Sequence, residues 1–120
     1  MKIIGDSLVP FKEYFKVSSI DDIRKTKPNG DLYFTYNEEI LEFCFRENLS
    51  FYVEISNISQ GLFANSLNAR YIVCKDMDLA KDMQKIADNY MFDSKILLLI
   101  KNRDMLEEVA LNEIDGVIIE

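Results

Sequence analysis

The 120-residue sequence contains no histidine, and it has only four glycines, two prolines and two cysteines. Without histidine the chain lacks the usual general base at neutral pH and the commonest metal ligand. Two cysteines that lie far apart do not supply the ligands of a structural zinc site. We therefore expect no metal and no cofactor. The scarcity of glycine and proline indicates regular, ordered structure.

Positive charge is also scarce, because the net charge is −7 and the isoelectric point is near 4.6. A nucleic-acid-binding face or a face for an anionic membrane needs clustered Lys and Arg, which this sequence does not offer. No apolar run approaches the roughly 20 residues that span a bilayer, and the first residues do not resemble a signal peptide. Cys44 and Cys74 lie in apolar stretches and are interpreted as buried thiols. Together these features favour a cytoplasmic protein.

Residues 5–8 read GDSL, the letters that open the motif of the GDSL serine hydrolases. A serine nucleophile needs a histidine to accept its proton and oxyanion donors further along the chain. This chain has no histidine, so Ser7 is interpreted as a solvated turn residue and the match as coincidence. We predict that a Ser7→Ala change leaves any esterase activity unaltered.

From residue 31 onward, apolar strand-like runs alternate with amphipathic helical stretches, which is typical of a parallel sheet covered by helices. Asn37 is predicted to cap the first of these helices. The first 30 residues are less regular, with a capping-box pattern at Ser19 and a turn over 27–31. The predicted strands of the regular part are 31–36, 50–56, 69–74, 95–100 and 115–120.

These patterns predict one α/β domain over residues 1–120, with a mainly parallel sheet of about six strands and helices packed on it. Residues 31–120 form the βα repeats of this domain. The sequence leaves two architectures open. The sheet is either flat and flavodoxin-like, or curved into a half-barrel.

The stretch LLIKNRDMLEEVALNEIDGVIIE, residues 98–120, resembles two consecutive strands of a phosphate-binding (β/α)8 barrel. Enzymes of tryptophan and histidine biosynthesis have such barrels. Over residues 31–120 the resemblance implies half of a barrel, since a complete one needs about 250 residues. Those barrels bind phosphate through glycine-rich loops, whereas this chain has no Gly-x-Gly. No catalytic residue is therefore carried over.

Ligands of parallel α/β sheets bind at the carboxyl ends of the strands, so the candidate ligand-binding residues are those that follow predicted strands. Two of them are lysines that could bind an anion, and a desolvated lysine could form a Schiff base with a carbonyl substrate. Carboxylates such as Glu120 suit a hard cation, but their spacing does not favour a metal site. The candidates are Glu54, Asn57, Lys75, Asp76, Lys101, Asn102 and Arg103.

Two functional hypotheses follow. We expect a non-catalytic protein that self-associates or binds a small ligand, such as an anion, or a protein partner. The alternative is a lyase- or isomerase-like half-barrel that acts on a phosphorylated metabolite through Lys75 or Lys101. The apolar run 117–119 in the last strand, with no helix after it, suggests an exposed sheet edge and hence a two-fold homodimer. The competing outcome is that this strand lies inside the sheet and the chain is a monomer.

Overall fold

The computed structural model describes residues 1–26 and 29–120, so residues 27 and 28 of the turn expected over 27–31 lie outside it. The described residues form seven strands, five α-helices and one 3-10 helix. The strands are β1 (Lys2–Ile4), β2 (Tyr14–Lys16), β3 (Asp31–Thr35), β4 (Phe51–Ile55), β5 (Tyr71–Cys74), β6 (Lys95–Ile100) and β7 (Gly116–Ile119). The helices are α1 (Ile20–Arg24), α2 (Glu38–Arg46), α3 (Ile58–Ser66), α4 (Met77–Asn89), the 3-10 helix η1 (Arg103–Met105) and α5 (Leu106–Leu111).

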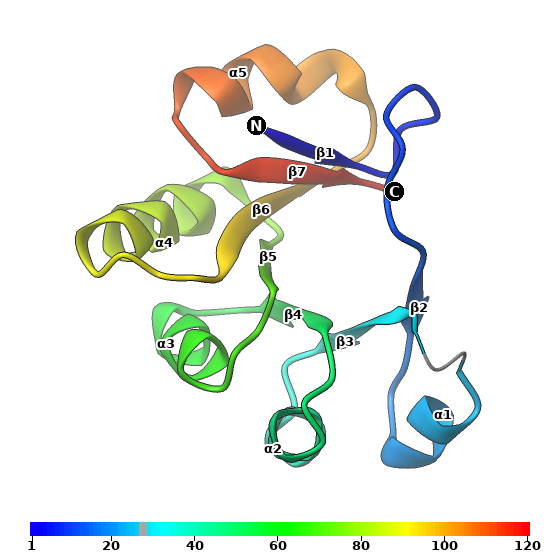
Figure 1. Ribbon diagram of the computed structural model, residues 1–120. Helices are drawn as coiled ribbons and strands as arrows, with labels where there is room; N and C mark the ends of the chain where they lie inside the picture. The colour runs from blue at the N-terminus through cyan, green and yellow to red at the C-terminus, as the bar shows by residue number, and fades with distance from the viewer. Residues whose placement is uncertain (27–28) are drawn as a thin grey trace.

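All seven strands are parallel and belong to one sheet with the order β1-β7-β6-β5-β4-β3-β2. The sheet curls, and the helices lie along its outer side (Figure 1). β1 and β2 stand at the two ends of the strand order, and residues 5–13 join them along the right side of Figure 1. The architecture is therefore a parallel half-barrel with one strand more than predicted, and not a flat flavodoxin-like sheet.

Each βα unit is built by the same local signals. Asn37, Asn57 and Asp76 follow strands closely and cap α2, α3 and α4 through side-chain bonds to a backbone N–H. Ser19 caps α1 in the same way. Both predicted caps, Ser19 and Asn37, are thus confirmed. At their C-termini, α2, α3, α4 and α5 end before a residue with positive φ, respectively Asn48, Asn68, Met91 and Glu113.

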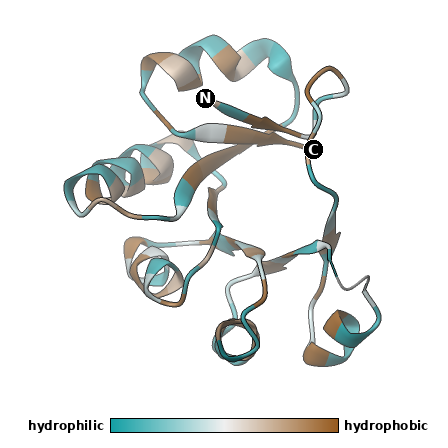
Figure 2. Ribbon diagram, viewed as in Figure 1, coloured by the Kyte–Doolittle hydropathy of each residue, from teal (hydrophilic) through white to brown (hydrophobic). Residues whose placement is uncertain are grey.

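The apolar core has two parts, one on each face of the sheet. The larger part lies between the outer face and the helices, whose sheet-facing sides are apolar (Figure 2). The smaller part lies on the inner face and contains four tyrosines. Their rings stack with centroid separations of 5.7 Å from Tyr14 to Tyr33, 5.9 Å from Tyr33 to Tyr52 and 4.6 Å from Tyr52 to Tyr71. Tyrosines therefore fill the concave side of the half-barrel.

The last strand does not form an edge. β7 pairs with β1 on one side and with β6 on the other, and Val117 and Ile118 are fully buried. Of the two placements expected for this strand, the exposed edge is wrong and the position inside the sheet is confirmed, because the N-terminal strand pairs beside the C-terminal one. The edges belong to β1 and β2 instead, and each has only three residues.

Candidate functional site

The carboxyl end of the half-barrel carries a cluster of charged side chains and tyrosines. Glu54, near the end of β4, accepts a hydrogen bond from the Tyr33 hydroxyl at 2.6 Å. Its other carboxylate oxygen lies 3.1 Å from Lys75 Nζ, just beyond β5. Burial, followed by the bond to Glu54, raises the pKa of Tyr33. Tyr33 therefore stays protonated and serves as a hydrogen-bond donor.

A second cluster of the same composition links β2, at one end of the strand order, to the residue after β7, the strand next to the other end. Glu120, after β7, accepts hydrogen bonds from Tyr14 Oη and Lys16 Nζ, both at 2.7 Å. A further ion pair lies at the same end of the strands, where Arg103 donates two hydrogen bonds to the Asp6 carboxylate, at 2.6 and 2.7 Å. These bonds to Arg103 lower the pKa of Asp6 to about 2. Both contacts join distant parts of the chain and hold the curved sheet together.

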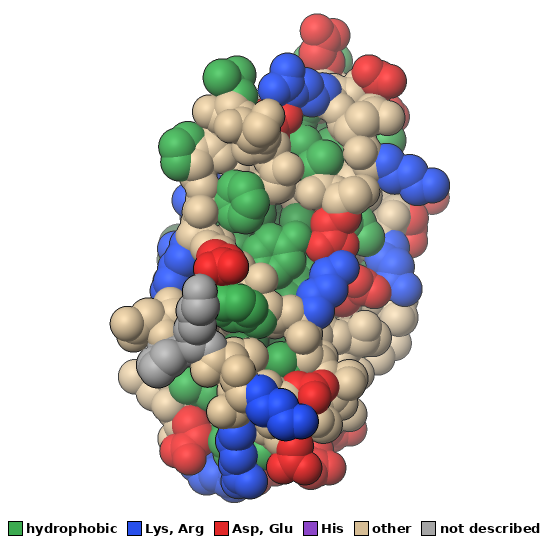
Figure 3. Space-filling model, turned by 90° about the vertical axis from the view of Figure 1, so that its right-hand side faces the viewer, with side chains coloured by type: hydrophobic (Ala, Val, Ile, Leu, Met, Phe, Trp, Pro, Cys, Tyr) green, Lys and Arg blue, Asp and Glu red, His purple; other side chains and the backbone are tan. Residues whose placement is uncertain are grey.

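Figure 3 shows the side of the molecule on which β7 ends. Apolar side chains are visible at its centre, and acidic and basic side chains surround them. The ionic contacts of this end thus lie at the rim of an apolar interior.

The structure brings only two of the seven predicted site residues, Glu54 and Lys75, into direct contact with each other. Asn57 and Asp76 are helix caps, and Asn102 binds the Asp104 N–H at the start of η1. Arg103 is bound to Asp6, and Lys101 is exposed. In the described residues, no group of three or more acidic or thiol side chains is arranged to hold a metal ion. Most of the polar residues after the strands therefore stabilise the fold.

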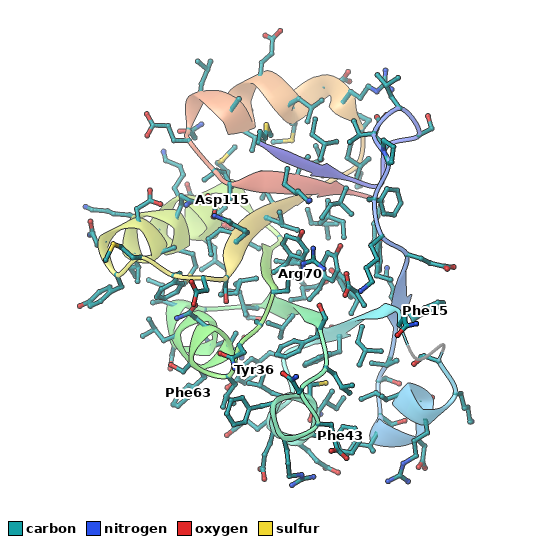
Figure 4. The ribbon with its side chains drawn as sticks, viewed as in Figure 1. Phe15, Tyr36, Phe43, Phe63, Arg70 and Asp115 are labelled. Atoms are coloured by element: carbon teal, nitrogen blue, oxygen red, sulfur yellow. The ribbon has the colours of Figure 1, made fainter. Side chains whose placement is uncertain are left out.

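A cavity of about 970 Å³ lies at the opposite, amino end of the strands. Met1 and Lys2 line it on the β1 side, and the segments that enter β4, β5, β6 and β7 complete it. The lining residues from these segments are Cys44, Phe45, Asn48, Leu49 and Ser50, then Asn65, Leu67, Asn68, Ala69, Arg70 and Tyr71, and finally Asp93, Ser94, Lys95 and Asp115. Figure 4 labels two of them, Arg70 before β5 and Asp115 before β7.

The groups around this cavity suit binding better than covalent chemistry. Its one thiol, Cys44, is fully buried, and burial raises its pKa to about 12, so it does not supply a thiolate at neutral pH. The described lining also includes three cationic side chains, two aspartates and several amides. These side chains can donate and accept hydrogen bonds to a polar ligand, and Phe45, Leu49 and Leu67 offer apolar contacts.

Sequence reasoning missed this cavity because it followed the rule that places ligands at the carboxyl ends of strands. A signal was nevertheless present. Lys2 and Lys95 are the first residues of β1 and β6, and Arg70 directly precedes β5. The equal intervals between Tyr14, Tyr33, Tyr52 and Tyr71 were a second missed signal, since residues at a fixed place in successive βα units share one face of the sheet.

Fold and geometry define an α/β protein with a seven-stranded parallel half-barrel. No protein-family model matches the chain, and no curated protein matches it. No helix among the described residues combines the length and the apolar character that a membrane crossing requires. The function must therefore be argued from the two ends of the half-barrel.

Proposed function

We propose that this protein is a non-catalytic, cytoplasmic binding protein whose small ligand occupies the cavity at the amino end of the strands. The single observation that carries the proposal is the size of this cavity, about 970 Å³, combined with its mixed polar and apolar lining. Pockets for metabolites span about 300–1,000 Å³ and have such linings. Two cysteines that are both free and buried support a reducing compartment.

The state of the carboxyl end supports the same proposal. There, Glu54, Glu120 and Asp6 are each bound to a cation of the chain itself. A ligand at this end would have to break those contacts before it gained its own. At the amino end, in contrast, a ligand would enter space that already exists.

Native mass spectrometry tests the proposal. The protein is incubated with the small-molecule fraction of a cell extract, and we expect a non-covalent adduct of defined mass. Leu67→Trp places an indole in the cavity and should abolish the adduct. Leu62→Trp is the matched control, because Leu62 lies on α3, is exposed and does not line the cavity. Absence of any adduct, or an adduct that persists in Leu67→Trp, would contradict the proposal.

A second candidate function is the lyase- or isomerase-like activity on a phosphorylated carbonyl compound. The contiguous contacts among Lys75, Glu54 and Tyr33 favour it, because an amine, a carboxylate and a phenol are the groups of Schiff-base chemistry. Against it, Lys75 is 57% exposed, whereas lysines of this kind are desolvated. Borohydride trapping with glycolaldehyde phosphate tests whether Lys75 forms a Schiff base. Selective reduction onto Lys75, lost in Lys75→Gln, would show the Schiff base that this alternative requires, and equal labelling of Lys101 would contradict it.

We also propose that the protein forms a two-fold dimer. Its support is the pair of sheet edges on β1 and β2, together with two exposed apolar residues, Leu8 and Phe11, in the segment that joins these strands. Light scattering at micromolar concentration should give twice the 14.0 kDa mass of the chain. The monomer mass at every concentration would contradict the dimer.

A further inference from the structure

The charge around the amino-end cavity differs from that of the whole protein. Although the chain has a net charge of −7, the cavity is lined by three cations, Lys2, Arg70 and Lys95, and by two acids, Asp93 and Asp115. Among the residues that the structure describes, no carboxylate lies within ion-pair distance of Lys2 or Lys95. These two ammonium groups are therefore available to a ligand.

The acids of the cavity are less available than its cations. Asp115 Oδ2 accepts the backbone N–H of Ile96 at 2.9 Å, which ties this carboxylate to the start of β6. Asn65 Oδ1 likewise accepts the Ser94 N–H, at 3.4 Å, so the free donors of Asn65 are its amide N–H groups. Of the two aspartates, only Asp93 has no such structural bond in the part of the chain described. The groups left for a ligand are thus mainly donors and cations.

Arg70 is held in a fixed position at the cavity. Its Nη1 lies 3.4 Å from Asp31 Oδ2, and its guanidinium lies over the Tyr71 ring at 5.3 Å. Asp31 is 1% exposed and is balanced a second time by Lys12, 3.3 Å from its Oδ1. Because two cations share this one buried carboxylate, the group retains a net positive charge beside the cavity.

The helix C-termini around the cavity carry partial negative charge, which opposes an anion. Their carbonyls are, however, partly closed off by the turns that end the helices. The N–H groups of Leu49, Ala69, Phe92 and Ile114 bind back to the carbonyls of Cys44, Ala64, Ala87 and Val109, with N···O distances of 2.9, 3.0, 2.9 and 3.4 Å. These turns weaken the opposing field, and each lysine carries a full charge where each helix C-terminus carries about half of one.

We propose that the ligand of this cavity is a small organic anion, with a phosphate or carboxylate group bound between Lys2 and Lys95 and assisted by Arg70. This inference rests on the proposed function and specifies its ligand class. Lys2 projects from β1 and Lys95 from β6, and both lie on the inner face of strands that flank β7. Gly116 of β7, which itself has no side chain, pairs with Lys2 on one side and with Leu97, two residues after Lys95, on the other.

The test compares three aromatic probes of similar size: phenyl phosphate, benzoate and the neutral benzyl alcohol. Isothermal titration calorimetry measures their dissociation constants for the wild type and for the double variant K2Q/K95Q. Each ammonium group would donate a charge-assisted hydrogen bond to the anion, so the loss of both should raise the dissociation constants of the two anions by at least about tenfold. K81Q/K85Q, which removes two exposed lysines of α4, is the charge-matched control and should bind like the wild type.

The outcomes separate this inference from the function on which it rests. Tighter binding of either anion than of benzyl alcohol, lost in K2Q/K95Q only, supports the inference and tells phosphate from carboxylate. If benzyl alcohol binds as tightly as the anions and Leu67→Trp abolishes the binding of all three probes, the cavity is a binding site and only the anion assignment is overturned. If Leu67→Trp leaves the dissociation constant of every probe unchanged, the proposed function is contradicted as well.

Discussion

The two ends of the half-barrel are built from the same kinds of side chain but arrange them differently. At the carboxyl end, three acids, Asp6, Glu54 and Glu120, each contact a cation from another part of the chain, respectively Arg103, Lys75 and Lys16. At the amino end, Lys2 and Lys95 face a cavity and have no such partner among the described residues. Charges that satisfy each other stabilise a fold, whereas charges without partners beside a cavity can bind a ligand. Substitutions at the first end should therefore change stability, and substitutions at the second should change binding.

The largest effect on stability is expected from Gly5→Ala, where β1 leaves the sheet at the carboxyl end. Gly5 has a φ of +97°, and an added Cβ would overlap the backbone carbonyl oxygen of Ile119. Strain and overlap together should lower the free energy of unfolding by at least about 2 kcal/mol. Urea denaturation measures this loss of free energy. In the control, Gly30→Ala, the added Cβ meets a side chain, that of Phe15, and not the backbone, and Gly30 does not have a positive φ, so the loss should be smaller.

A smaller effect is expected from Glu54→Gln. Glutamine keeps an acceptor for the Tyr33 hydroxyl but removes the charge opposite Lys75. Because Lys75 is largely solvated, the loss should be about 1 kcal/mol. Glu42→Gln removes an exposed pair with Arg46 within α2 and should cost less, about 0.3–0.5 kcal/mol. Equal losses in the two variants would show that the carboxyl-end cluster is no more than a surface ion pair.

A third effect should appear only in acid. The pKa of Asp6 is lowered from 3.8 to about 2, so its contribution is complete above pH 4 and is lost as the pH falls towards 2. Wild-type stability should therefore fall across this window with a steeper slope than that of Asp6→Asn, which has no proton to bind there. Thermal denaturation at closely spaced pH values measures the two slopes. Identical slopes would mean that Arg103 does not stabilise the Asp6 carboxylate.

The smallest effect on stability is expected at the amino end. Lys2 and Lys95 are exposed and have no ion-pair partner in the described part of the chain. The free energy of unfolding of K2Q/K95Q should therefore lie within about 0.5 kcal/mol of the wild-type value. A loss above about 1 kcal/mol would mean that these lysines stabilise the fold, and the contrast between the two ends would fail.

The sequence predicted the βα repeat well, because its signals are local. An apolar run, an Asn or Asp cap and an amphipathic helix each depend on neighbouring residues, as at Asn37 and α2. The pairing of β1 with β7 was not predictable in this way. Ile3 and Val117 are partners across nearly the whole chain, and nothing local to either residue specifies the other.

The candidate site was predicted less well than the fold. Side chains such as Asn57 and Asp76 were selected for their place after a strand, and their capping role has the same sequence signature. The cavity, in contrast, depends on where the ends of several βα units meet after the sheet has curled. Curvature is a property of the assembled sheet, so the cations at the strand starts were visible in the sequence but the cavity that they line was not.

Mapping of a bound anion onto the backbone tests the central claim most directly. Two-dimensional ¹H–¹⁵N NMR spectra of the wild type are recorded during a titration with phenyl phosphate. The account predicts that the shifted amides cluster around Ser50, Arg70 and Lys95, at the amino end of the strands. Shifts that cluster instead around Ser56, Lys75 and Lys101, at the carboxyl end, would contradict it.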